Sequence, residues 1–280
     1  MKLLDRNNIT IENSKSKIGL ATTGGDTWKV WDRFITYNNQ QLFHIGNVCG
    51  TCNFFFHKLD ISINEKLAPT LLIKKLNEGI TKLDKETVEQ YSVLFPNDKY
   101  EVLLFEFKPK LVFPGDENDY FSNDLFKTWE NDEIENQEEE DDDENYIDHK
   151  KATIEYYRGQ DKPIKEEDKI YEFYIPIFQN SQLDEERIKY YEDLIEVGQK
   201  PTVLALSFLD VKCPCFYPTI NGIEVKPYYF THWCFANYLI DGHHKIQAAY
   251  RKQKSITILT FLAKELSWKQ TDELIKFYQH

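Results

Sequence analysis

The chain has 280 residues, enough for one large domain or two ordinary ones, and its formal net charge is −13. Twelve acidic residues and no Lys or Arg lie between Glu130 and Asp148, so the rest of the chain is close to neutral. A neutral body with one acidic strip argues against nucleic acid or an anionic membrane surface as the partner.

The apolar stretches of the sequence are too short to span a membrane. The first residues turn polar at once and lack the apolar core of a signal peptide. The sequence therefore predicts a cytoplasmic protein with no membrane partner. Its five cysteines are too few for a disulfide scaffold, so the thiols are expected to be reduced.

The first part of the chain, 1–117, is predicted to be a mixed-sheet α/β region. Loosely alternating apolar residues on both sides of Asn38-Asn39 predict a β-hairpin over residues 27–45. Three further elements are expected from apolar periodicity and from Pro and Gly at element ends: a helix between Pro69 and Gly79, a helix from about Asp84 to before Pro96, and a buried strand at 100–107.

Residues 118–150 become polar and then strongly acidic. The run Glu138–Glu144 repels itself and carries no apolar side chain to bury, which predicts a disordered linker or loop. Two alternatives stay open for this segment: an acidic tether that docks on a basic protein partner, or a site that collects metal ions.

The last part, 151–280, alternates between strand and helix patterns. Strands are expected at 152–157, 170–178, 203–209, 235–240 and 256–262, and helices at 184–198, at 243–252 and after a capping box formed by Ser267 and Gln270. With the N-terminal region, this pattern predicts an α+β protein.

The element order in this last part resembles the core of the ParB/sulfiredoxin superfamily. The matching strings are EVGQKP at 196–201, LIDGHHKIQAA at 239–249 and ITIL at 256–259, within a resemblance that covers 184–264. Members of the superfamily bind nucleotide phosphates at the corresponding loop. The resemblance therefore implies a ParB/sulfiredoxin-like domain whose small-molecule ligand is ATP, ADP or CTP with Mg²⁺.

The residues of the loop Asp241–Lys245 support an anion site on physical grounds. Gly242 allows a sharp turn, and the helix that follows presents unpaired amides and a positive dipole end. His243, His244 and Lys245 can add donors to a bound anion. The same residues could instead be ordinary turn and helix-start chemistry.

The chain departs from the family at three points. Sulfiredoxins have their catalytic Cys where this chain has His243, so peroxiredoxin repair is not expected. Lys245 stands in the usual Arg position and lacks bidentate geometry. The sixteen residues after Lys264 are too few for the DNA-binding domain of ParB, so a role in chromosome partition is not expected.

Cys49-x-x-Cys52 has the spacing of two zinc thiolates. Cys213 and Cys215, or alternatively His232 with Cys234, could supply the other two ligands, since residues two apart face the same side of a strand. A redox pair and plain buried thiols remain as the other interpretations.

Two classes of function follow from these patterns. The first is a nucleotide-dependent phosphotransferase or hydrolase, in which Gly242, His243, His244 and Lys245 hold the phosphates and Asp241 or His244 handles a proton. The second is a non-catalytic binding or regulatory module that keeps the same fold as a scaffold. Zinc could stabilise either one.

Overall fold

The computed structural model describes most of the chain with gaps, in the ranges 1–24, 32–47, 56–59, 61, 63, 67–125, 154–159, 168–212, 219–220, 223–224, 231–267 and 271–279.

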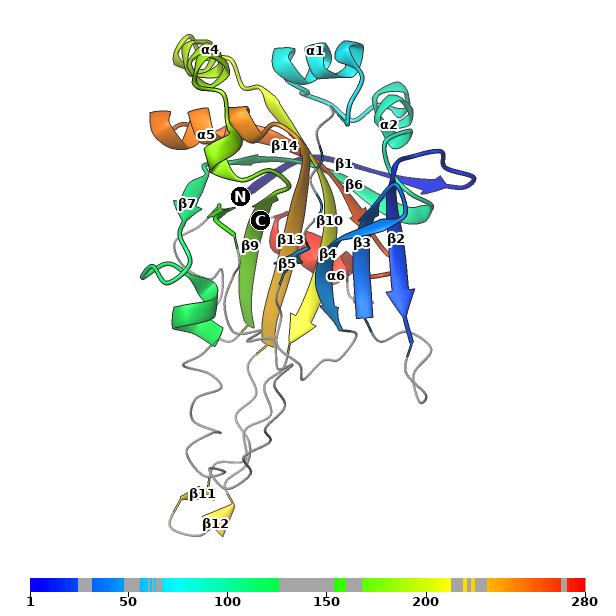
Figure 1. The fold of residues 1–280 in the computed structure, drawn as a ribbon, viewed down its shortest axis with the longest axis vertical. Helices are drawn as coiled ribbons and strands as arrows, with labels where there is room; N and C mark the ends of the chain where they lie inside the picture. Colours follow the sequence, from blue (N-terminus) through cyan, green and yellow to red (C-terminus); the bar gives the residue numbers. More distant parts are fainter. Residues whose placement is uncertain are drawn as a thin grey trace.

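The centre of the fold is an eight-stranded mixed sheet with the strand order β1-β6-β14-β10-β13-β9-β8-β7 (Figure 1). Its strands are β1 (Lys2–Ile11), β6 (Asp98–Phe107), β7 (Lys110–Val112), β8 (Tyr156–Arg158), β9 (Asp168–Pro176), β10 (Thr202–Lys212), β13 (Thr231–Asp241) and β14 (Ile256–Ala263). Strand β10 runs parallel to β14 and β13 runs parallel to β9, whereas β10 and β13 are antiparallel. Because β6 pairs with β14, the predicted N-terminal and C-terminal ranges share one sheet.

A second, antiparallel sheet has the order β2-β3-β4-β5. Its strands are β2 (Ile18–Thr23), β3 (Asp32–Tyr37), β4 (Gln40–Asn47) and β5 (His57–Lys58). The predicted hairpin is confirmed for β3 and β4, and Asn38 and Asn39 form its turn with φ of 47° and 63°, a conformation that Asn tolerates. A separate two-stranded sheet joins β11 (Thr219–Ile220) and β12 (Ile223–Glu224).

The described helices are α1 (Thr70–Glu78), α2 (Lys85–Ser92), α4 (Glu185–Glu196), α5 (His243–Lys252) and α6 (Thr271–Phe277). The first four begin and end close to the predicted bounds. Asp84 caps α2 by accepting from the Thr87 amide at 2.8 Å. The predicted capping box of α6 is wrong at its first residue, because Ser267 accepts from the amide of Leu209 and α6 begins four residues later. The combination of helices with a mixed and an antiparallel sheet confirms the α+β class.

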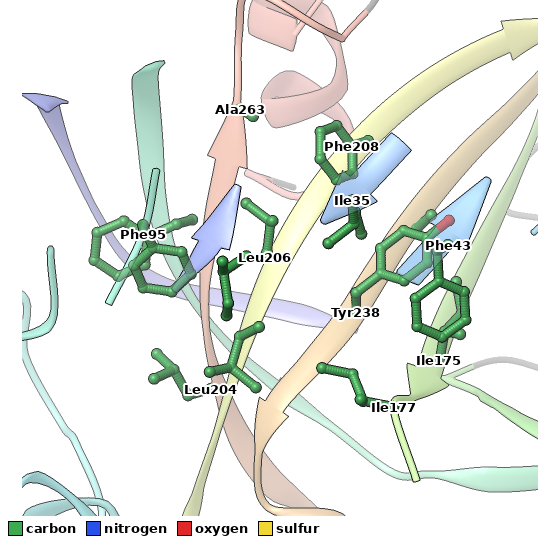
Figure 2. Packing of buried hydrophobic residues seen from close by; sticks show 14 of the residues in the cluster. Ile35, Phe43, Phe95, Ile175, Ile177, Leu204, Leu206, Phe208, Tyr238 and Ala263 are labelled. Carbon is green, nitrogen blue, oxygen red and sulfur yellow. The ribbon is translucent and has the colours of Figure 1, made fainter. Parts of the chain in front are cut away.

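The core lies on both faces of the large sheet. Along β10, Leu204, Leu206 and Phe208 face the side covered by the small sheet and by α1 and α2, and the alternate residues face helices α4, α5 and α6. Figure 2 shows Ile35 and Phe43 of the small sheet against this first face. The large sheet is therefore covered on both sides, which explains why its central strands are nearly continuous apolar runs.

One buried ion pair joins the two sheets. Arg33 of β3 contacts Asp210 of β10 at 2.7 Å and also donates to the carbonyls of Ile45, Gly46 and Leu266. The guanidinium is almost fully buried, and these acceptors replace the water that it loses. This contact fixes where the ends of β4 and β10 lie relative to each other.

The beginning of the predicted acidic linker belongs to the core. Residues 118–125 contain a π-helical turn, Tyr120–Leu125, in which Tyr120 and Phe121 are buried. Aromatic side chains explain this difference, since the disorder expected for the segment rested on acidic residues further along the chain. Residues 126–150 lie outside the described ranges. None of the helices in those ranges combines the length and apolarity needed to cross a membrane.

Candidate functional site

The predicted passage from strand to helix at Asp241-Gly242 is confirmed. Strand β13 ends at Asp241, α5 begins at His243, and Gly242 between them has a φ of +107°. A Cβ at Gly242 would stand 3.0 Å from Cγ2 of Val203, so both the backbone conformation and the close packing require glycine. The first helical bond runs from the Ile246 amide to the Gly242 carbonyl, and no side chain caps the helix. The amides of the first turn therefore have no intrahelical acceptor.

The two histidines hold the backbone of the segment 177–184, which follows β9. His243 Nε2 accepts from the Ile177 amide at 3.1 Å, and His244 Nε2 accepts from the Asp184 amide at 3.0 Å. We call this segment, 177–184, the strap. Both rings must be neutral for Nε2 to accept, so each carries its proton on Nδ1. Burial is the main cause that lowers the pKa of His243, to about 3, and burial also lowers the pKa of His244.

Lys245 is turned into the fold. Its Nζ donates to Asp241 Oδ2 at 2.7 Å and to the carbonyl of Thr202 at 3.0 Å, and its side chain is 1% exposed. Burial lowers the pKa of Lys245, and the Asp241 carboxylate opposes this shift. The sequence pattern predicts an ammonium that grips a ligand, whereas the observed contacts use it to neutralise Asp241 at the entry to α5.

A cavity of about 320 Å³ opens at the start of α5, and we call it the α5 pocket. It is lined by Asp241, Gly242, His243 and His244 together with residues of the strap, of α4 and of 63–73: Ile63, Leu67, Ala68, Ile73, Phe178, Gln182, Leu183, Arg187, Tyr191 and Ile240. The pocket lies beyond the carboxyl ends of the parallel strands β9 and β13, where α/β sheets commonly bind ligands. Apolar and polar groups share its wall: Asp241, His243 and His244 lie at the α5 end, whereas Gln182 comes from the strap and Arg187 from α4.

Arg187 in the first turn of α4 is the cation in this lining, and sequence patterns did not single it out. Helix α4 is held against α5 by a bidentate ion pair in which Arg251 contacts both carboxylate oxygens of Glu185, at 2.6 and 2.8 Å. Arg187 itself is exposed and makes no ion pair with a described residue. Its spacing of four residues from Tyr191, which also lines the pocket, is the signal that could have indicated it.

The four predicted zinc ligands, Cys49, Cys52, Cys213 and Cys215, lie outside the described residues. The described part of the chain holds no cluster of three His, Cys, Asp or Glu side chains suited to a metal ion.

The alternative pair, His232 and Cys234, is buried next to Tyr120. His232 Nδ1 is 3.0 Å from the Tyr120 hydroxyl, and the Cys234 thiol is 3.7 Å from it. Both residues thus face one side of β13, as their spacing predicts.

No family model, no curated protein and no solved structure matches the chain. The ParB/sulfiredoxin-like assignment therefore stays a prediction from the strings at 196–201, 239–249 and 256–259.

Proposed function

We propose that the α5 pocket binds a nucleotide, with a phosphate at the amino end of α5. The observation that carries this proposal is the convergence of three features on one cavity: uncapped amides of a ten-residue helix, a glycine-kinked entry, and the guanidinium of Arg187. Helix amides and the helix dipole favour an anion, and an arginine fork suits phosphate geometry.

The remainder of the pocket fits the less polar part of such a ligand. Leu67, Ile73, Phe178 and Ile240 give it apolar walls, and Tyr191 adds an aromatic ring. Lys245 serves the site indirectly, because its contact with Asp241 compensates a carboxylate that would otherwise repel a phosphate. The family resemblance supplies ATP, ADP and CTP with Mg²⁺ as the first ligands to test.

Calorimetric titration of ATP, ADP and CTP with Mg²⁺ tests the proposal. Arg187→Gln should weaken binding about tenfold or more, since a hydrogen bond to a charged group contributes about 1.5–3 kcal/mol. Lys189→Gln is the matched control, because Lys189 lies on the same helix and contacts Asp193 at 2.8 Å. The proposal fails if none of the three nucleotides gives a heat of binding, or if Arg187→Gln and Lys189→Gln bind nucleotide with equal affinity.

A second candidate function is binding without catalysis. The observation that favours it is that His244 and Asp241, the two groups predicted to move protons, are both held by contacts within the fold. A general base needs a lone pair within reach of its substrate, and the Nε2 lone pair of His244 is directed at the Asp184 amide. Release or transfer of phosphate from a bound nucleotide, measured with the wild type, would contradict this second function.

The acidic segment is proposed as a tether in this second case, and it has its own test. Deletion of 131–148 should remove a basic protein partner from pull-downs while nucleotide binding remains. Unchanged partners after the deletion would argue against the tether.

A further inference from the structure

A second cavity, of about 310 Å³, shares Phe178 with the α5 pocket. It is lined by residues of β5, of the strap, of the end of β9 and of the chain that follows β7 and precedes β8: Lys58, Pro114, Ile154, Glu155, Pro176, Phe178, Gln179, Asn180 and Ser181. We call it the Lys58 cavity. The middle of the strap faces this cavity and its end, at Gln182 and Leu183, faces the α5 pocket.

Lys58 is a partly buried cation whose side chain has no hydrogen bond or ion pair with any described residue. Loss of hydration is the cause that lowers its pKa, and no carboxylate in the described ranges offsets that loss. A cation that is desolvated without a partner costs free energy, and an anion placed beside it would recover part of that cost.

The carboxylate in the lining of the Lys58 cavity, Glu155, already accepts a hydrogen bond from the strap. Glu155 accepts a short hydrogen bond from Nδ2 of Asn180, and Oδ1 of Asn180 accepts from the Tyr157 hydroxyl at 3.3 Å. Glu155 is therefore fixed on Asn180 and lies beyond ion-pair distance of Lys58. Among the described residues, no carboxylate is left to compensate the positive charge of the cavity, and the polar side chains of Gln179 and Ser181 are also in its lining.

We propose that the Lys58 cavity is a second binding site, which takes the carboxylate or phosphate group of a small ligand onto Lys58. The ring of Phe178 packs edge-on against His243 with 4.8 Å between centroids. One aromatic ring thus separates this site from the amino end of α5, so ligands in the two cavities would approach each other across Phe178. The proposal does not depend on what the α5 pocket binds, because its cation is Lys58 rather than Arg187 and Phe178 is the one lining residue, among those described, that the two cavities share.

Inorganic phosphate and acetate are the probes, titrated at constant ionic strength into ¹⁵N-labelled full-length protein. We expect saturable shifts of the amides of Gln179, Asn180 and Ser181 with at least one probe, and the stronger probe indicates the class of ligand. Lys58→Gln should weaken this binding roughly tenfold or more, whereas Lys58→Arg should retain most of it. The exposed Lys82→Gln is the charge-matched control and should leave the binding unchanged.

Two further measurements separate this site from the α5 pocket. The thermal midpoint of Lys58→Gln should be no lower than that of the wild type, since the substitution removes a desolvated charge and no contact between described residues. Arg187→Gln should leave the anion-induced shifts at the strap in place. Absence of a saturable shift with both probes, equal affinity in Lys58→Gln, or loss of the shifts in Arg187→Gln would each overturn the proposal.

Discussion

Lys245→Met separates a lysine that grips a ligand from a lysine that completes the fold. Methionine keeps most of the aliphatic volume but removes the contacts to Asp241 Oδ2 at 2.7 Å and to the Thr202 carbonyl at 3.0 Å. The Asp241 side chain is only 16% exposed, so its carboxylate would remain largely desolvated and unpaired. Breaking a buried pair in this way costs about 3–5 kcal/mol, and two charge-assisted hydrogen bonds give a loss of the same order.

Urea unfolding followed by tryptophan fluorescence measures this loss in the free energy of unfolding. The double variant Asp241→Asn with Lys245→Met should recover part of it, because it also removes the stranded carboxylate. Nucleotide calorimetry on the folded fraction supplies the second readout. If Lys245→Met unfolds within about 0.5 kcal/mol of the wild type while nucleotide binding is lost, the lysine is a ligand group and the structural reasoning is refuted.

Three other predictions follow from particular contacts. The free energy of unfolding should fall by up to about 1.4 kcal/mol per pH unit as the pH drops from 6.5 toward 3, because His243 protonates at its ordinary pKa in the unfolded chain and only at about 3 in the folded one. An equal dependence of the unfolding free energy on pH in His243→Asn would contradict this. Gly242→Ala should destabilise the protein more than Gly198→Ala, as compared by urea midpoints. Gly198 also has a positive φ, of +90°, but no described atom lies near the added Cβ, so its substitution should cost about 1 kcal/mol. If Cys49 and Cys52 bind zinc, elemental analysis of untagged protein finds a metal that is lost in Cys49→Ser, whereas a metal-free wild type leaves the redox pair and the buried thiols.

The helices could be predicted from sequence because their ends are set by local chemistry. Pro69 fixes the backbone before α1, Asp84 caps α2, and Gly79 and Gly198 adopt positive φ just past helix ends. The Asp241-Gly242 junction belongs to the same class. Each of these signals acts within a few residues, so no knowledge of the tertiary fold is needed to detect it.

The arrangement of the sheet could not be predicted in the same way. Strand β6 pairs with β14, although some 150 residues of sequence separate them, and its apolar run would suit any buried position. The contact between Arg33 and Asp210 joins residues 177 positions apart, and neither residue type signals a buried pair. Division of the chain into two α/β regions followed sequence order, whereas one sheet places five contiguous strands of the last range between β1 and β6 on one side and β7 on the other.

In the candidate site, too, the features set by local sequence could be predicted and those set by long-range contacts could not. The amino end of α5 could be predicted because strand, glycine and helix are adjacent in the sequence. The role of His243 and His244 could not be predicted, because their Nε2 atoms accept hydrogen bonds from amides of the strap, about 60 residues earlier in the chain. A histidine pair at a helix start can therefore contact either a ligand or the backbone, and the tertiary structure decides between the two by placing a backbone amide within hydrogen-bond distance.

The strap that the two histidines bind also determines where the cavities lie. The amides of Ile177 and Asp184 bind consecutive histidines, so both ends of the strap are held at the first turn of α5. Between these two points the chain makes a 3₁₀ turn, Asn180–Gln182, and Phe178 lines both the α5 pocket and the Lys58 cavity. On this view the histidines shape both cavities by binding the strap through Nε2. His244→Ala should then weaken nucleotide binding in the α5 pocket and anion binding in the Lys58 cavity, whereas Arg187→Gln and Lys58→Gln should each affect one. A His244→Ala protein with normal binding in both cavities would contradict this role of the strap.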